Sequence, residues 1–197
     1  MTNELIIRRL KGAEIIPYIP DLAELRIDIF KAYPYLYLGN LDYERRYLQT
    51  YIECPDSAMV LVFDHDHIVG ASTAIPLTRE TIEVQQPFLD HKINTQDVFY
   101  FGESVLKPAY RGQNIYRHFF RERETAAREY GCKIAAFAAV ERPLDDPKKP
   151  GDYVPLDSVW QHFGYKKHPE LRAFYKWTEI GETTESPKPL IFWLKNL

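Results

Sequence analysis

Segment 98–130 constrains the fold of this 197-residue chain more than any other part of it. Residues 98–106 are rich in aromatic and β-branched side chains, which predicts a strand, and Pro108 marks where its pairing ends. After a short Arg111-Gly112 loop, apolar residues recur with the spacing of an amphipathic helix at 115, 119, 126 and 130. The arginines of this helix are expected to lie off its apolar face: Arg117, Arg121 and Arg123. The segment therefore predicts a strand, a tight loop and a helix in succession.

The loop at Arg111-Gly112 is a candidate anion site. A short loop that leads into a helix N-terminus offers unpaired backbone N–H groups and the positive end of the helix dipole, which suit a phosphate or a pyrophosphate. Arg111 and Arg117 add positive charge beside it. The alternative is that Gly112 serves only a turn that needs a positive φ. The glycine patterns of the nucleoside-triphosphate and dinucleotide folds are both missing from the sequence, so neither fold is supported.

Composition and charge narrow the class of protein. With 45% hydrophobic and 14% aromatic residues, the chain is expected to form one globular domain, 1–197. A net charge of −3 argues against a nucleic-acid partner. Neither a signal-peptide pattern nor a run of transmembrane length is found, which predicts a cytoplasmic protein without a membrane partner. Cys54 and Cys132 lie far apart, have no zinc-binding spacing and are expected to be buried free thiols.

Periodicity and turn residues predict the remaining elements. They are a strand at 5–10, helices at about 20–31 and 41–53, a hairpin of strands 58–63 and 68–75, an irregular or weakly helical region at 79–96, a helix at 114–129, a strand at 132–140, a long proline-rich loop at 141–157, a helix at 156–163, and strands at 172–180 and 190–194. Strand 98–106, the helix after it and strand 132–140 form a βαβ unit, whose two strands are expected to run parallel.

This order of elements, with the loop Pro108-Ala-Tyr-Arg-Gly-Gln-Asn-Ile-Tyr116 at its centre, resembles the GNAT superfamily of acyl-CoA-dependent N-acetyltransferases. Arg111 takes the first place of the family's glycine loop, whereas Asn114 and Tyr116 replace two later small residues. The stretch Trp160-Gln-His-Phe-Gly-Tyr165 is similar to a later signature of the family. The resemblance covers nearly the whole chain. It implies a mixed α/β fold with a mostly antiparallel sheet, helices on both faces, and splayed parallel strands 98–106 and 132–140.

The resemblance also implies acetyl-CoA as co-substrate, and no metal. The pantetheine arm is expected in the gap between the splayed strands, paired with backbone groups of Val105, Leu106 and Lys107, and an N–H near Leu106 is expected to bind the oxyanion. The pyrophosphate is expected at the loop formed by Arg111, Gly112, Gln113, Asn114, Ile115 and Tyr116. Asn tolerates the left-handed conformation that such a loop requires. The Tyr116 ring either points away from the ligand, stacks on it or weakens its binding.

Acid–base groups are the next requirement, because an acceptor amine with a pKa of about 10.4 is mostly protonated at neutral pH. Glu103 is the candidate base, with burial expected to raise its pKa, and a structural pair with a nearby Arg is the alternative. Many relatives carry their acid one residue earlier, at Gly102 in this chain. The family's thiolate-protonating tyrosine falls on Trp160, whose indole cannot serve as an acid. Tyr153 and Tyr165 are the candidate replacements, with packing roles or a proton from solvent as the alternatives.

The sequence thus predicts an N-acetyltransferase in which a primary amine, of a small molecule or a protein, attacks the thioester directly. The alternatives are a degenerate acyl-CoA-binding or regulatory module without turnover, and an interaction scaffold with an empty loop. Residues 33–37 and the loop 141–157 are expected to wall the acceptor pocket, with core packing or a homodimer interface as the alternative for the first. The turn 64–67 is expected to be solvated rather than metal-binding. The acceptor itself is not identified.

Overall fold

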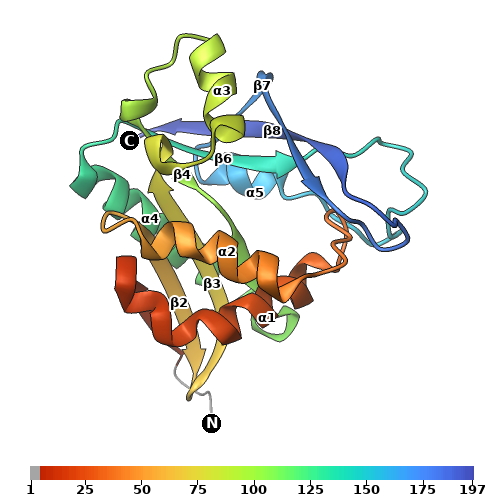
Figure 1. The fold of residues 1–197 in the computed structure, drawn as a ribbon, viewed down its shortest axis with the longest axis horizontal. Coiled ribbons are helices and arrows are strands. Elements are labelled where there is room, and N and C mark those ends of the chain that lie inside the picture. The colour runs from red at the N-terminus through yellow and green to blue at the C-terminus, as the bar shows by residue number, and fades with distance from the viewer. Residues whose placement is uncertain (1–4) are drawn as a thin grey trace.

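The computed structural model describes residues 5–197, in which one sheet lies between two sets of helices (Figure 1). Residues 1–4, which belong to the predicted domain 1–197 and to the N-terminal segment searched for a signal peptide, lie outside the described residues. The helices are α1 (Ile19–Phe30), α2 (Leu41–Ile52), α3 (Ile82–Asp90), α4 (Ile115–Tyr130) and α5 (Asp157–His162). The strands are β1 (Ile6–Leu10), β2 (Ala58–Asp64), β3 (His67–Pro76), β4 (Val98–Phe101), β5 (Ser104–Leu106), β6 (Ile134–Val140), β7 (Lys166–Trp177) and β8 (Ser186–Asn196).

The sheet has the order β1-β2-β3-β4-β6-β8-β7, and β5 pairs with β3 off this path. The pairs along this path are antiparallel except β4 with β6, which is parallel, as the predicted βαβ unit requires. The antiparallel hairpin of β2 and β3 also agrees with the sequence. The predicted fold class, a mixed and mostly antiparallel sheet with helices, is confirmed.

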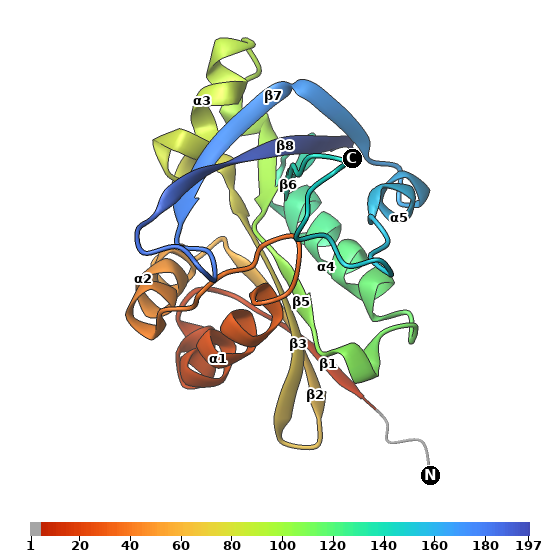
Figure 2. The same cartoon turned by 90° about the vertical axis from the view of Figure 1, so that its right-hand side faces the viewer.

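Helices cover both faces of the sheet (Figure 2). Alternate residues of β2 divide between the two sides, because successive strand side chains point in opposite directions. Met59 and Leu61 pack with Leu22 of α1 and Leu48 of α2 in one buried cluster. Val60 and Val62 pack with Phe119 of α4 in another. The strand β2 is therefore apolar from Ala58 to Phe63, because both of its faces are covered.

Helix boundaries follow local sequence signals. The side chain of Asn40 accepts hydrogen bonds from two backbone N–H groups in the first turn of α2. Gly131 ends α4 with a φ of +93°, a conformation that glycine adopts without strain. The predicted helices 20–31, 41–53, 114–129 and 156–163 are present within one or two residues.

The structure differs from the sequence prediction in three elements. Strand 98–106 is broken into β4 and β5, and β7 and β8 begin earlier than predicted. The region 79–96, expected to be irregular or weakly helical, contains the helix α3. The two last strands pair with each other over most of their length, and such tertiary pairing extends a strand beyond its local apolar pattern. Both cysteines are free and buried, as expected. Within residues 5–197, the search for a helix long and apolar enough to cross a membrane found none.

Candidate active site

A β-bulge divides the predicted strand 98–106. Strand β3 pairs Ile75 with Tyr100 and Ser72 with Ser104, so the β4–β5 side carries one more residue than β3 between these pairs. The extra residue lies at Gly102-Glu103, where the backbone of both residues bonds to Thr73. A bulge bends its strand and increases the local twist. The chain therefore turns away from β6 after Phe101.

This bend opens a gap in the middle of the sheet. Strand β4 pairs with β6 only over Val98–Phe101, whereas β6 continues to Val140 beside β8. Strand β5 follows β3 instead (Figure 2). The two predicted parallel strands thus part after four paired residues. This confirms the splayed arrangement.

Two backbone N–H groups of β5 face this gap. Lys107 N donates to Val69 O at 2.9 Å, and Thr73 N donates to Glu103 O at 3.1 Å, so Glu103, Val105 and Lys107 direct their backbone groups toward β3. In an antiparallel pair these directions alternate, and those of Ser104 and Leu106 therefore point into the gap. The sequence prediction for the Leu106 backbone agrees with this geometry. The backbone groups of Val105 and Lys107 are directed toward β3 instead.

The predicted anion loop has an open backbone. Gly112 has a φ of +77°, and the position of an added Cβ there meets no atom within 4 Å. Asn114 has a φ of +60° immediately before α4 begins, as the sequence prediction for this residue required. Arg111 and Gln113 are exposed, and Ile115 is buried beneath the first turn of the helix. The N–H groups of this turn therefore face solvent at the mouth of the gap.

Tyr116 does not fill the loop. Its ring packs at 5.6 Å from that of Phe120, and its hydroxyl interacts with the side chains of Trp160 and Ser104. Burial raises the pKa of the Tyr116 phenol, although the nearby Arg123 and both of these partners oppose the shift. A tyrosine hydroxyl from α4 thus lies beside β5, next to the indole that replaces the family tyrosine.

A first cavity of about 900 Å³, partly open to solvent, lies in the gap. Its wall combines the strand ends on both sides of the gap with α4, α5 and the loop before α5, and includes Gly102, Ser104, Tyr116, Ala139, Tyr153 and Trp160. Arg123 also lines it and is only 2% exposed, contrary to the prediction that this arginine lies off the buried face. The guanidinium donates to Glu103 O at 3.2 Å and lies over the Phe101 ring, so it supports the bulge from the α4 side.

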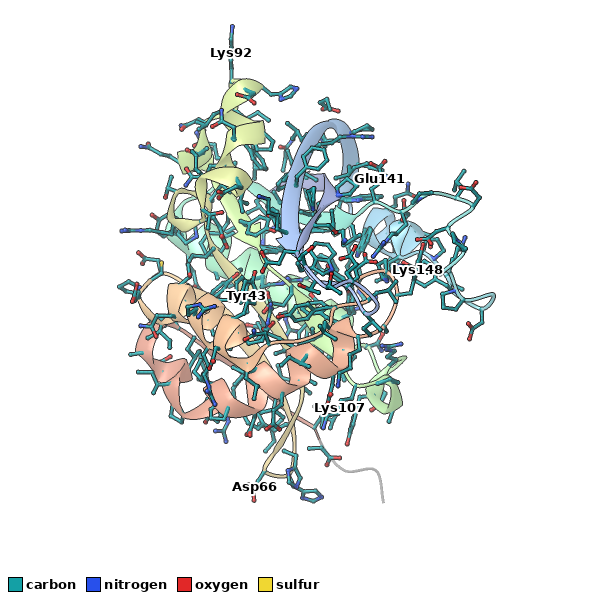
Figure 3. The ribbon with its side chains drawn as sticks, turned by 45° about the vertical axis from the view of Figure 1, so that its right-hand side comes forward. Tyr43, Asp66, Lys92, Lys107, Glu141 and Lys148 are labelled. Atoms are coloured by element: carbon teal, nitrogen blue, oxygen red, sulfur yellow. The ribbon has the colours of Figure 1, made fainter. Side chains whose placement is uncertain are left out.

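A second cavity of about 750 Å³ adjoins the first on the α1–α2 side. Tyrosine rings and carboxylates dominate its wall: Tyr35, Tyr37, Tyr43, Tyr47, Tyr100, Tyr175, Glu44, Glu80 and Glu103. Both cavities share Tyr35, Gly102 and Glu103, so the bulge forms the boundary between them. Figure 3 shows Tyr43 over α2 on this side of the molecule.

Glu103 is buried and has two partners. Its Oε1 is 2.5 Å from a nitrogen of Arg26, and its Oε2 accepts from the Tyr47 hydroxyl at 2.6 Å. Arg26 also donates to Glu44, so one buried guanidinium joins two buried carboxylates. The alternative considered for Glu103, a carboxylate paired with a nearby Arg, therefore describes its environment. Glu103 also lines both cavities, so it is still a candidate catalytic group.

Glu80 is one of the residues of this site that the sequence analysis did not find, together with Arg26, Glu44 and Tyr47. It follows the end of β3 in the segment expected to be irregular, is half-buried and lines the second cavity. Burial raises the pKa of its carboxyl to about 7, with a smaller contribution from the charge of Glu103. No local pattern marks this residue. Its environment is created by α2, β4 and β7, which meet only in the fold.

The two candidate tyrosines lie in different places. Tyr153 lines the first cavity and packs edge-to-face on Tyr33 at 4.7 Å, and burial raises its pKa. Tyr165 is 1% exposed, packs on Phe137 and donates to Glu124 at 3.2 Å. Tyr165 is not among the residues that line either cavity, and its pKa is raised far above the ordinary range. The packing role weighed for Tyr165 matches this placement.

The long loop 141–157 is tied down at one side of the first cavity. Arg142 donates to Pro34 O at 2.8 Å and to Glu179, and Lys148 lies 2.8 Å from Glu179. Figure 3 shows Glu141 and Lys148 along this loop, far from Asp66 at the tip of the β2–β3 hairpin. Residues 33–37 and this loop thus both contribute to the wall of the first cavity, through Pro34, Tyr35, Glu141 and Tyr153. Among residues 5–197, no cluster of metal-ligating side chains was found at the hairpin or elsewhere.

The comparisons with known proteins agree in fold and find no match in sequence. No protein-family model matches the chain, and no curated protein matches its sequence. A candidate acetyltransferase of Acinetobacter baylyi has a TM-score of 0.65 at 10% identity, covering 100% of this chain and 95% of its own. An acetyltransferase of the GNAT family from Streptococcus pneumoniae has a TM-score of 0.59 at 11% identity, covering 98% and 100%. A candidate acetyltransferase of Salmonella typhimurium, solved with acetyl-CoA, has a TM-score of 0.55 at 9% identity, covering 99% and 95%.

These neighbours extend over nearly the whole of both chains. The parallel strands that part in mid-sheet, the bulge and the open loop before α4 occur here in one described unit. At sequence identities of 9–11%, these likenesses establish the fold but do not identify the acceptor substrate. The chain therefore has the fold of the GNAT acetyltransferases.

Proposed function

We propose that this protein transfers the acetyl group of acetyl-CoA to a primary amine. The observation that carries the proposal is the gap between β5 and β6, which presents the N–H groups of Ser104 and Leu106 on one side. A pantetheine arm is itself a chain of amides and pairs with a strand edge in the manner of an added strand. The open turn at Gly112 and Asn114 suits the pyrophosphate at the helix mouth. A fold neighbour that was solved with acetyl-CoA supports this choice of ligand.

The reaction would take place at the boundary of the two cavities. There the N–H of Ser104 or of Leu106 is directed toward the thioester oxygen, which becomes the oxyanion when the amine attacks. The attacking nitrogen forms a bond to the carbonyl carbon, the C–S bond breaks, and the nitrogen of an ammonium acceptor loses two protons in total. One of them neutralises the leaving thiolate. The other must leave the site through a basic group.

Tyr116 is the proposed proton donor to the thiolate. Its hydroxyl contacts Ser104 and Trp160, whereas the Tyr165 hydroxyl is bonded to Glu124 outside both cavities. The bulky ring at this position then replaces the family tyrosine that Trp160 displaced. Tyr153, which lines the same cavity, is the second candidate.

Tyr116→Phe is expected to lower the turnover rate on the order of 10²-fold while acetyl-CoA binding stays close to that of the wild type, because only the hydroxyl is lost. The single-turnover release of coenzyme A thiol measures the rate, and isothermal titration measures binding. Tyr153→Phe serves as the comparison within the same cavity. Equal rates for Tyr116→Phe and the wild type would show that solvent supplies this proton.

The proposal as a whole is tested by isothermal titration of the protein with acetyl-CoA, followed by thiol release across a panel of primary amines. Cys54 and Cys132 are buried, so the protein's own thiols are expected to add little background. Binding together with amine-dependent thiol release is the expected result. Binding without turnover favours the alternative, an acyl-CoA-binding module. The observation that favours this alternative is that Tyr116, which replaces a small residue of the family loop, lines the first cavity. Lack of binding at millimolar acetyl-CoA rejects both.

A further inference from the structure

Four side chains form a continuous row from the bulge to Glu80. The Tyr47 hydroxyl lies 2.6 Å from Glu103 Oε2 and 2.9 Å from the Tyr51 hydroxyl, which lies 3.5 Å from Glu80 Oε1. The two tyrosines are four residues apart on α2, the spacing that places side chains on one face of a helix. Their rings meet edge-to-face at 5.5 Å. The row therefore connects two carboxylates through two phenols.

The number of protons in this row is informative. The row contains three hydrogen-bond contacts, but two phenols supply only two hydrogens for them. With both carboxylates ionised, one contact is left without a hydrogen. One additional proton, on either carboxylate, gives every contact its hydrogen. The row is thus complete when it holds a single extra proton, and that proton is able to reside at either end.

The two ends of the row differ in charge. Glu103 is paired with Arg26 and faces both cavities. Glu80 has no cation within ion-pair distance in the described part of the chain, and it lines only the second cavity. The titratable groups that face it are acids and phenols from α2, the bulge, β4 and β7: Tyr47, Tyr51, Glu103, Tyr100 and Tyr175. The Thr81 backbone N–H also donates to Glu80 Oε2 at 3.3 Å. These surroundings favour a protonated Glu80.

We propose that Glu103, Tyr47, Tyr51 and Glu80 form a proton relay, in which Glu103 takes a proton from the acceptor ammonium and Glu80 receives and stores it. This inference rests on the proposed function. It assigns the second cavity to an amine that arrives protonated, since several tyrosine rings line its wall and aromatic rings attract an ammonium group. Glu103 is then the group that touches the amine, and Glu80 acts through the tyrosines.

The transfer balances without any further reactant. The N–H bond of the ammonium breaks as Glu103 gains the proton. Glu103 passes a proton to the Tyr47 oxygen, the Tyr47 proton moves to Tyr51, and the Tyr51 proton moves to Glu80. Both phenols are neutral before and after the transfer, Glu103 is again a carboxylate, and Glu80 is a carboxylic acid that later loses its proton to solvent. Because burial raises the pKa of Glu80 to about 7, its carboxylate form is regenerated near neutral pH.

The decisive variants are Tyr51→Phe and Glu80→Gln, because neither residue touches the amine in the proposed relay. Each is expected to lower kcat at pH 7 on the order of 10²-fold, with the loss shrinking above pH 9, where more of the amine is already unprotonated. In the wild type, kcat is expected to fall as the pH drops below about 7, because Glu80 is then already protonated. The double variant is expected to be no slower than either single variant, since both break one path. Tyr130→Phe and Glu129→Gln, exposed residues at the end of α4, are the matched controls.

The raised pKa of Glu80 also predicts how Glu80→Gln affects the stability of the fold. A carboxyl whose pKa is raised by folding stabilises the folded protein at low pH, and that contribution is lost as the pH rises through about 7. Removing the charge in Glu80→Gln therefore is expected to leave the variant at least as stable as the wild type at pH 8. Wild-type kcat in both Tyr51→Phe and Glu80→Gln would overturn the relay.

A measurement without substrate separates the relay from the proposed function. In ¹³C-glutamate NMR of the free protein, the Glu80 carboxyl is expected to titrate near pH 7, and Tyr51→Phe or Glu103→Gln is expected to shift its midpoint. Such coupling in a protein that turns over no amine supports the relay and rejects only the transferase. An independent Glu80 titration, unmoved by either variant, rejects the relay even if turnover is normal.

Discussion

Replacement of Arg26 by methionine is expected to lower the free energy of unfolding by about 3–5 kcal/mol, because it leaves two buried carboxylates without their cation. Arg26 contacts Glu44 and Glu103, and all three side chains are at most 8% exposed. Its guanidinium also lies over the Tyr47 ring at 4.1 Å. Urea unfolding at pH 7, followed by circular dichroism, measures the loss.

The control for this experiment is Arg45→Met, which removes an exposed arginine paired with Asp42 at 3.4 Å on the same helix pair. Exposed pairs of this kind contribute about 0–1 kcal/mol. Adding Glu44→Gln and Glu103→Gln to Arg26→Met is expected to restore part of the lost stability, since no uncompensated charge then remains buried. If Arg26→Met is as stable as Arg45→Met, the buried ion pairs do not hold α1 and α2 against the bulge.

Gly102→Ala is expected to abolish most of the turnover, because the new methyl group has no room. A Cβ at this position would lie 2.2 Å from the Tyr51 hydroxyl oxygen, 2.6 Å from Thr73 Oγ1 and 2.8 Å from the Tyr47 hydroxyl oxygen. Both phenols must move, which breaks the row of hydrogen bonds and costs about 1–3 kcal/mol of stability as overpacking. Steady-state thiol release and thermal unfolding record the two effects.

Gly151→Ala is the matched substitution, because nothing lies within 4 Å of its added Cβ. It is expected to unfold at nearly the wild-type temperature. A Gly102→Ala protein with normal turnover would mean that neither phenol position matters for the reaction. In that case the row at the bulge would be a structural feature of the core alone.

The sequence predicted the framework of this protein because the framework depends on local patterns. The helical spacing in 115–130, the glycine at 131 and the apolar run of β6 each indicate their element without tertiary information. The parallel pair followed from the βαβ order of elements, and the parting of its strands from the resemblance to a known family. The left-handed Asn114 followed from the residue type.

The bulge and the second cavity could not be predicted in this way. A single inserted residue changes strand register without a visible change in composition, so Gly102-Glu103 was taken as part of an unbroken strand. Arg123 was assigned to a polar face because helical periodicity does not show that its guanidinium contacts the Glu103 carbonyl and the Phe101 ring. Glu80 acquires its environment only from segments that are distant in sequence.

Backbone amide exchange with and without acetyl-CoA tests the central claim most directly. The claim is that the gap edge of β5 binds the coenzyme through two N–H groups, while β3 occupies the residues between them. We predict that acetyl-CoA slows exchange at Ser104 and Leu106, whereas Val105 and Lys107 are protected in both states. Binding that leaves Ser104 and Leu106 exchanging at their original rates would contradict the account.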